Sequence, residues 1–231
     1  MNGQLDPSDY TGMSFWIISA AMVAATFFFW VERDRAVGKW KTSLTVAAMV
    51  TGIAAIHYFY MRGVWASTGE SPLVFRYVDW LLTVPLQIVE FYLILAAIAV
   101  VKSSLFWRLL IASVIMLVAG YLGEVGSVNV WAGFVVGMLG WLYIIYEVFA
   151  GEASQINASK GTAASQRAFN ALRLIVTIGW AIYPIGYVLG NMVDVTDGIQ
   201  TMNIIYNFAD LINKTAFGLV IWAAAKADTQ S

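Results

Sequence analysis

The chain contains seven runs of mostly apolar residues, and this pattern is the strongest limit on what it can fold into. The runs cover residues 12–31, 43–62, 74–98, 105–123, 130–150, 168–190 and 201–225. A helix needs about 20 apolar residues to cross a hydrocarbon core roughly 30 Å thick, and an open sheet cannot satisfy its backbone hydrogen bonds there. The sequence therefore predicts an all-α membrane protein, a seven-transmembrane-helix bundle that forms one domain over residues 1–231.

The composition agrees with a membrane protein and excludes several other classes. Hydrophobic residues make up 60% of the 231 positions and charged residues only 12%, about half the charged share of a soluble domain. Cysteine is absent and there is one histidine, which excludes a disulfide framework and a thiol nucleophile, and we expect no metal site. A net charge of −1 gives no general attraction to nucleic acid. We expect membrane lipid to be the surrounding partner.

Basic residues gather on one side of the predicted spans. Ten of the 13 lysines and arginines follow the first, third, fifth and seventh spans, whereas the other side holds Arg62 alone. The positive-inside rule predicts a cytoplasmic C-terminus and an external N-terminus in the cell inner (plasma) membrane. The start of the chain lacks a basic n-region and an apolar h-region, so we expect any signal peptide to be absent or already removed. The two longest connections, 63–73 and 151–167, are polar or rich in Gly, Ser and Ala.

The third span carries five polar side chains within one sector of a helical wheel. Arg76, Thr83, Gln87 and Glu90 all lie within about 80° of Asp79. Ionised groups are costly in a bilayer, so this stripe is expected to face the bundle interior. Asp79 and Glu90 are about 16 Å apart along the axis, which suits two stations of a proton relay. The alternative is that these side chains only join helices through hydrogen bonds.

The seventh span has a second polar stripe, in which Asn203, Asn207, Asp210 and Lys214 follow at steps of 4, 3 and 4. Asp210 and Lys214 are one turn apart, so an ion pair is the simplest interpretation. A buried ion pair stabilises a fold poorly, however, because desolvation offsets the attraction. A deep lysine is suited to forming a Schiff base with an aldehyde, and Asp79 and Asp210 are the available counter-ions.

Three segments, "RYVDWLLTVPLQIVEFYLIL", "WAIYPIGY" and "ADLINKTAFGLVIW", together resemble the microbial rhodopsins, specifically the proteorhodopsins. The resemblance covers essentially all seven spans. It implies that Lys214 binds all-trans retinal covalently as a Schiff base. Asp79 matches the primary counter-ion and proton acceptor, and Glu90 matches the proton donor. Asp210 matches the second counter-ion, and Arg76 matches the arginine beside the counter-ions.

The residues at positions 79, 83 and 90 indicate which ion such a protein moves. Asp79, Thr83 and Glu90 resemble the triplet of outward proton pumps, whereas chloride pumps lack the first acid and sodium pumps carry Asn, Asp and Gln. We therefore expect a light-driven outward proton pump, which is an ion transporter and not an enzyme. A slow-cycling sensory photoreceptor of the same fold is the alternative, although sensors commonly lack a carboxylate at the position of Glu90. A carrier without photochemistry, in which Lys214 is only an ion-pair partner, is the third interpretation.

Aromatic residues and one amide complete the expected retinal site. By the resemblance, Trp80, Trp180, Tyr183 and Tyr187 line the retinal, although such a stripe alone would indicate packing between helices. Gln87 stands where the family has Leu in green-absorbing and Gln in blue-absorbing members, so we expect blue tuning. Whether a carotenoid antenna binds is left open.

The only histidine, His57, would by default be a structural residue satisfied by hydrogen bonds. By the resemblance it bonds Asp79, and because such a pair titrates as a unit, we expect pumping to depend on pH near neutrality. It also matches a contact between protomers, with Trp16 as the neighbour's tryptophan, which implies a homo-oligomer, a pentamer or hexamer.

The chain departs from archaeal pumps at the external end, where those proteins release the proton from a pair of glutamates. The corresponding connection here offers only Asp194 and Asp197. Glu124 and Glu147 lie near the ends of spans, and we expect them to be interfacial.

Overall fold

The computed structural model describes residues 6–193 and 196–229. Within these residues, seven helical segments are long and apolar enough to cross a membrane, and each overlaps one of the seven predicted runs. The all-α class and the seven spans are therefore confirmed. The spans are Tyr10–Arg35, Trp40–Thr68, Leu73–Ala96, Ser103–Glu124, Val130–Lys160, Ala163–Asn191 and Gly198–Asp228.

The spans are built from helices of different length and type. The first contains α1 (Tyr10–Glu32) and a short 3-10 turn, η1 (Arg33–Arg35). The next three are single helices: α2 (Trp40–Thr68), α3 (Leu73–Ile98) and α4 (Ser103–Glu124). The fifth contains α5 (Val130–Phe149) and α6 (Glu152–Lys160). The sixth contains α7 (Ala163–Leu174), a π-helical segment η2 (Ile175–Gly179) and α8 (Ile182–Asn191), and the seventh is α9 (Gly198–Thr229).

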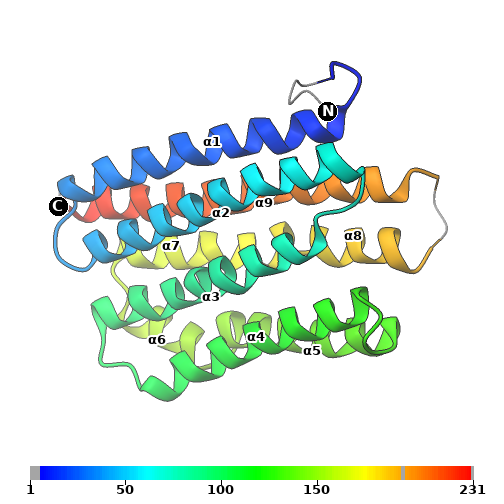
Figure 1. Cartoon of the computed structure of the whole chain (residues 1–231). Coiled ribbons are helices and arrows are strands. Elements are labelled where there is room, and N and C mark those ends of the chain that lie inside the picture. The colour runs from blue at the N-terminus through cyan, green and yellow to red at the C-terminus, as the bar shows by residue number, and fades with distance from the viewer. Residues whose placement is uncertain (1–5, 194–195, 230–231) are drawn as a thin grey trace.

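The helices run side by side as a bundle, with the two termini at opposite ends (Figure 1). Helices that follow one another in the chain pack together from α1 to α5, and α9 packs against α1, α2, α7 and α8. This arrangement closes the bundle around the polar faces of α3 and α9. The polar stripes predicted on these helices accordingly lie inside, since Arg76, Asp79, Glu90, Asp210 and Lys214 are all at most 2% exposed.

Local sequence signals explain where several helices begin and end. The side chain of Asp9 caps α1 by accepting the backbone N–H of Gly12 at 2.8 Å, and Asn129 caps α5 in the same way. Capping side chains satisfy N–H groups that have no partner within the helix. Gly69 ends α2 in the left-handed region, with φ of 70°, where a glycine has no steric penalty.

The two longest connections between the predicted spans are partly helical. Residues 63–68 continue α2, and residues 152–160 of the polar connection form α6. The carboxylate of Glu147 accepts the backbone N–H of Ala153 at 3.1 Å, and Thr162 caps α7. These bonds satisfy free backbone N–H groups at the starts of α6 and α7. The composition of the connection alone does not predict these helical segments.

The sixth span is interrupted near its middle. The π-helical segment and the two turn residues Trp180 and Ala181 separate α7 from α8, and Pro184 is the third residue of α8. A proline has no N–H and its ring clashes with the carbonyl four residues earlier, here that of Trp180. The indole of Trp141 donates to the carbonyl of Val176 at 2.9 Å, so a neighbouring helix satisfies part of the irregular backbone.

Helices α4 and α5 pack so closely that their backbones touch where α5 has a glycine. A Cβ atom placed on Gly133 would lie 2.7 Å from the carbonyl oxygen of Ala119, and one on Gly140 would lie 2.9 Å from that of Ala112. Both distances are shorter than atoms tolerate, so only glycine fits at these positions.

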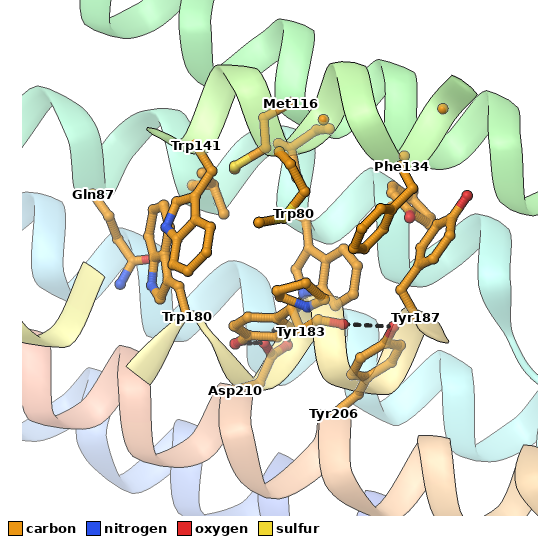
Figure 2. Close-up of a pocket in the computed structure, with 18 of the residues that line it drawn as sticks. Trp80, Gln87, Met116, Phe134, Trp141, Trp180, Tyr183, Tyr187, Tyr206 and Asp210 are labelled. Atoms are coloured by element: carbon orange, nitrogen blue, oxygen red, sulfur yellow. Dashed lines mark hydrogen bonds between the residues drawn. The ribbon is translucent and has the colours of Figure 1, made fainter. Parts of the chain in front are cut away.

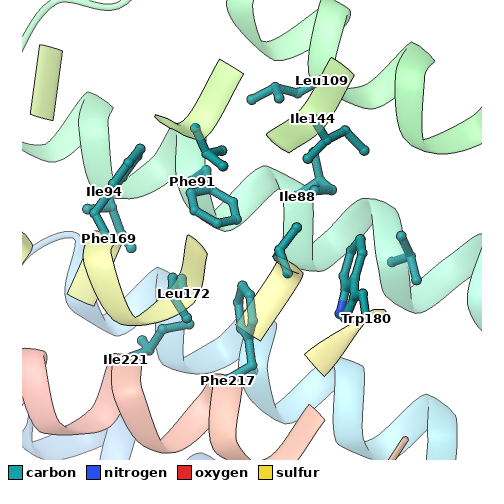
Figure 3. Packing of buried hydrophobic residues seen from close by; sticks show 14 of the residues in the cluster. Ile88, Phe91, Ile94, Leu109, Ile144, Phe169, Leu172, Trp180, Phe217 and Ile221 are labelled. Carbon is teal, nitrogen blue, oxygen red and sulfur yellow. The ribbon is translucent and has the colours of Figure 1, made fainter. Parts of the chain in front are cut away.

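A cluster of buried apolar side chains fills the part of the bundle between Trp180 and the end of α3 (Figure 3). The ring of Phe91 on α3 meets that of Phe169 on α7 at 5.3 Å and that of Phe217 on α9 at 6.3 Å, both edge to face. Three helices are therefore joined by aromatic contacts in the half of the bundle that contains Glu90.

Candidate functional site

A cavity lies inside the bundle (Figure 2), and Lys214 is one of the residues that line it. Its empty volume is about 770 Å³, which includes open solvent at its mouth. Gln87 and Trp180 lie towards one end of it, and Phe134 and Tyr187 towards the other (Figure 2). Its walls come from α3, α4, α5, α8 and α9. All six residues expected to hold a cofactor line this cavity: Trp80, Gln87, Trp180, Tyr183, Tyr187 and Lys214.

Lys214 forms two ion pairs in the interior. Its Nζ donates to Oδ2 of Asp79 on α3 and, at 2.9 Å, to Oδ2 of Asp210 on its own helix. All three side chains are at most 2% exposed. Two carboxylates thus face one amine, which is an arrangement suited to keeping a nitrogen protonated.

The two carboxylates differ in how well they are satisfied. Asp210 accepts hydrogen bonds from Tyr58 at 2.8 Å, Tyr183 at 2.6 Å and the indole of Trp80 at 3.1 Å. Such charge-assisted bonds stabilise the ionised form. Oδ1 of Asp79 has no hydrogen-bond partner in the described part of the chain. Asp79 is therefore the less well satisfied of the two carboxylates.

His57 and Thr83 both lie next to Asp79, but neither donates a hydrogen bond to its carboxylate. Nδ1 of His57 is 3.5 Å from Oδ1 of Asp79 and 3.0 Å from the carbonyl oxygen of Ile53 on the same helix. The hydroxyl of Thr83 donates to the backbone carbonyl of Asp79 at 3.0 Å. Thr83 therefore fixes the helix turn that carries Asp79.

Glu90 is isolated. It is 1% exposed, and neither carboxyl oxygen has a hydrogen-bond partner among residues 6–193 and 196–229. The buried hydroxyl of Ser43 on α2 is a polar neighbour of this carboxyl group, without a hydrogen bond to it. An ionised carboxylate in such a place would cost several kcal/mol, so the apolar surroundings favour the neutral, protonated acid.

Gln87 presents an amide to the cavity. It is 1% exposed and lines the cavity wall, and its Nε2 has no hydrogen-bond partner in the described chain. An unpaired buried donor costs about 1–3 kcal/mol. The amide is thus free to interact with a molecule in the cavity.

The two glutamates near the span ends differ in burial. Glu147, in the last turn of α5, is 2% exposed because it turns inward to cap α6. Glu124 is half-buried and accepts hydrogen bonds from Tyr77 at 2.8 Å and Asn191 at 3.2 Å. Asp197 is exposed, and Asp194 lies outside the described residues.

Several residues of the site were not found by sequence reasoning. Tyr206 lies one turn before Asp210, so helical spacing could have identified it. Tyr58, which bonds Asp210, follows His57 in a span with no polar stripe. Trp141, Phe134 and Met116 come from spans that are apolar on all sides, where the sequence gives no sign of which face is inside.

Comparison with known proteins identifies the family. The model of the family described as "Bacteriorhodopsin-like protein" matches residues 9–227. The chain belongs to this family. Rhodopsins of this family are light-driven proteins of the plasma membrane and bind retinal covalently through a lysine.

Individual relatives cover nearly the whole chain. The green-light absorbing proteorhodopsin of Gamma-proteobacterium EBAC31A08 is 54% identical over 99% of this chain and 92% of its own length. The blue-light absorbing proteorhodopsin of Gamma-proteobacterium Hot 75m4 is 53% identical over 99% of this chain and 91% of its own length. Blue light-absorbing proteorhodopsin from Med12, whose crystal structure is known, is 57% identical in sequence to this chain. The two structures match over 95% of this chain and 100% of the Med12 chain, with a TM-score of 0.84. This rhodopsin is therefore similar to both colour types.

The cavity of this rhodopsin fits retinal. Its lining is mainly aromatic and aliphatic, as a long conjugated hydrocarbon requires, and the carboxylate of Asp210 in this lining accepts a hydrogen bond from the amine of Lys214. The unpaired amide of Gln87 adds one polar contact along the wall.

Proposed function

We propose that the chain is a light-driven outward proton pump whose retinal is bound covalently to Lys214. One observation carries this proposal: α3 holds two buried carboxyl groups, of which one has a cationic partner and the other has none. Asp79 pairs with Lys214, whereas Glu90 is alone in an apolar environment. A pump needs an acceptor that is ionised at rest and a donor that is protonated at rest, and these environments favour those two states.

Bound retinal would supply absorption of visible light and a change of shape that alters how firmly the Lys214 nitrogen holds its proton. Asp79 accepts that proton, since it already bonds this nitrogen and has a second oxygen without a partner. Asp210 keeps its charge, because three protein donors besides Lys214 stabilise its ionised form. The two carboxylates thereby take different roles, acceptor and permanent counter-ion.

Glu90 returns a proton to the Lys214 nitrogen. It lies about 16 Å along α3 from Asp79, on the side where the helix ends before Lys102. That end of the bundle carries the connections rich in lysine and arginine, which the positive-inside rule assigns to the cytoplasm. Protons then enter past Glu90 and leave past Arg76, which is the outward direction.

The amide of Gln87 supports blue tuning. A dipole beside the retinal chain that stabilises the ground-state charge distribution more than the excited state widens the energy gap and shortens the absorption wavelength. The relatives do not decide the colour, because green-absorbing and blue-absorbing proteorhodopsins are 54% and 53% identical to this chain.

The outer face around α1 and α2 suits a homo-oligomer, a pentamer or hexamer. Trp16 is 43% exposed and its ring packs beside Phe59, which is also exposed. His57 lies just behind this face, with its side chain 17% exposed. Lipid covers the remaining apolar surface.

The test is the external pH of cells that express the chain, are supplied with all-trans retinal and are illuminated. We expect light-dependent acidification that a protonophore abolishes, and no visible absorption or pH change in Lys214→Ala. A visible band without any pH change would contradict pumping and favour the sensory photoreceptor. A protein that never absorbs visible light would contradict the retinal site itself.

A further inference from the structure

The guanidinium of Arg76 is buried without a carboxylate partner. The side chain is 0% exposed and lies among the rings of Phe15, Tyr58 and Tyr206, 5.3–5.9 Å from their centroids. Within residues 6–193 and 196–229, no Asp or Glu oxygen lies within 4.0 Å of its nitrogens. A buried cation without an ion pair is costly, so the groups that do contact it are informative.

Neutral oxygens hold the guanidinium in place. Nη2 of Arg76 donates to Oδ1 of Asn203 at 3.0 Å and to Oδ1 of Asn207 at 2.8 Å. Nη1 donates to the hydroxyl of Tyr58 at 3.3 Å, and this hydroxyl in turn donates to Asp210. Asn203 and Asn207 lie one turn apart on α9 and are 0% exposed.

The surroundings fix which end of each amide faces Arg76. The hydroxyl of Ser14 donates to the carbonyl of Thr11 at 2.7 Å, so its oxygen is left to accept Nδ2 of Asn207 at 2.8 Å. Because one atom of that amide must donate to α1, the other must present an oxygen to Arg76.

Asn203 is oriented in a similar way from the other side. Its Nδ2 donates to the carbonyl of Ile199 at 2.9 Å, and its Oδ1 also accepts the hydroxyl of Ser71 at 3.2 Å. Helix α1, the connection before α3, and α9 thus combine to turn two amide oxygens towards one guanidinium.

We infer that Asn203 and Asn207 are positioning residues that hold Arg76 through uncharged oxygens, so that its positive charge remains available to Asp79 and Asp210. A carboxylate at either position would form an ion pair and cancel most of that charge, whereas an amide orients the guanidinium without neutralising it. The inference rests on the proposed function, because it assigns a purpose to the charge of Arg76. Other polar or titratable groups around this centre are His57 and Tyr58 from α2, Glu124 from α4, Tyr183 from α8, and Tyr206 and Lys214 from α9.

The test is a titration of the colour of the retinal-loaded protein, which reports protonation of Asp79 without measuring transport. Asn203→Leu and Asn207→Leu remove the amide oxygens and add no charge, so they act on Asp79 only by releasing Arg76. A cation at about 4–6 Å moves the titration of a carboxyl group by about 1–3 pH units. We expect each variant to move the colour transition to higher pH by about one unit.

The same substitutions in an Arg76→Gln background separate positioning from general damage. Without the guanidinium, the leucine variants should cause no further shift. Asn157→Leu is the matched control, since this amide of α6 is also buried but lies outside the cavity and does not contact Arg76, and its titration should stay at the wild-type pH. If a leucine variant does not bind retinal, Asn203→Ser and Asn207→Ser serve in its place, because serine is too short to reach Arg76.

Two results would overturn the inference: an unmoved transition in the single variants, or an equal shift with and without Arg76. A wild-type protein that forms no colour would instead contradict the proposed function. The two failures are therefore distinguishable in one set of samples.

Discussion

Replacing Glu90 by Gln removes the acidic proton of the candidate donor and little else. The side chain is 1% exposed, and neither of its carboxyl oxygens has a hydrogen-bond partner in the described chain. No protein hydrogen bond is therefore lost, and the amide has nearly the same shape as the neutral acid. The variant should fold, bind retinal and absorb at the wild-type wavelength, because Glu90 is not among the residues that line the cavity.

The expected effect is on the speed with which the Lys214 nitrogen regains its proton after a flash. A positioned proton donor accelerates transfer by about 10²–10⁴-fold, so Glu90→Gln should slow this step at least about 100-fold, which corresponds to about 2.7 kcal/mol of barrier. With no donor in place, the proton must come from solution through the apolar cluster around Phe91. The rate should then fall in proportion to the proton concentration as pH rises.

Flash photolysis at several pH values measures this rate. Glu147→Gln is the matched control, since Glu147 is equally buried but caps α6 away from the cavity, and its recovery should equal that of the wild type. Recovery of Glu90→Gln at the wild-type rate, with no dependence on pH, would refute the role of Glu90 as donor. It would also remove the main argument against a sensory protein.

Three further substitutions test other parts of the site. Gln87→Leu should move the absorption maximum to longer wavelength, and an unchanged spectrum would refute tuning by this amide. His57→Asn should move the pH of the colour transition, because it removes the ring whose Nδ1 lies 3.5 Å from Asp79; an unmoved transition would show that the two groups are not coupled. Gly140→Ala should destabilise the protein by about 1–3 kcal/mol through overpacking, seen as a lower thermal denaturation temperature, and full stability would contradict the close contact with Ala112.

The sequence predicted the parts of the site that carry charge, because ionisable residues are rare in a membrane span and each one needs a reason. Helical spacing alone placed Asp79 and Glu90 on one face, and both are buried in the structure. The apolar residues that line the cavity were harder to predict. Trp141 and Phe134 belong to a span that is apolar around its whole circumference, so no periodicity separates the face towards lipid from the face towards the cavity.

Polar residues near the span ends were the least predictable. The position of Glu147 near a span end is visible in the sequence, but its burial depends on the backbone turn into α6 and on the N–H of Ala153 that it accepts. Tyr58 was missed for a related reason, since its importance comes from Asp210 on a helix far away in the chain. Such contacts depend on how helices are rotated against one another, and a single sequence contains no direct record of that rotation.

The glycine contacts between α4 and α5 determine how the cavity can change its size. Gly133 and Gly140 of α5 lie against the backbone of α4, so these two helices cannot move closer together. The side of the cavity that they form is therefore rigid. Any adaptation to a bulkier or differently shaped chromophore must therefore come from side chains on that wall, such as the flexible Met116 and Met138, or from α8 on the opposite side. Efforts to change the pigment of this protein should begin at those two methionines, because they can be exchanged without separating the helices.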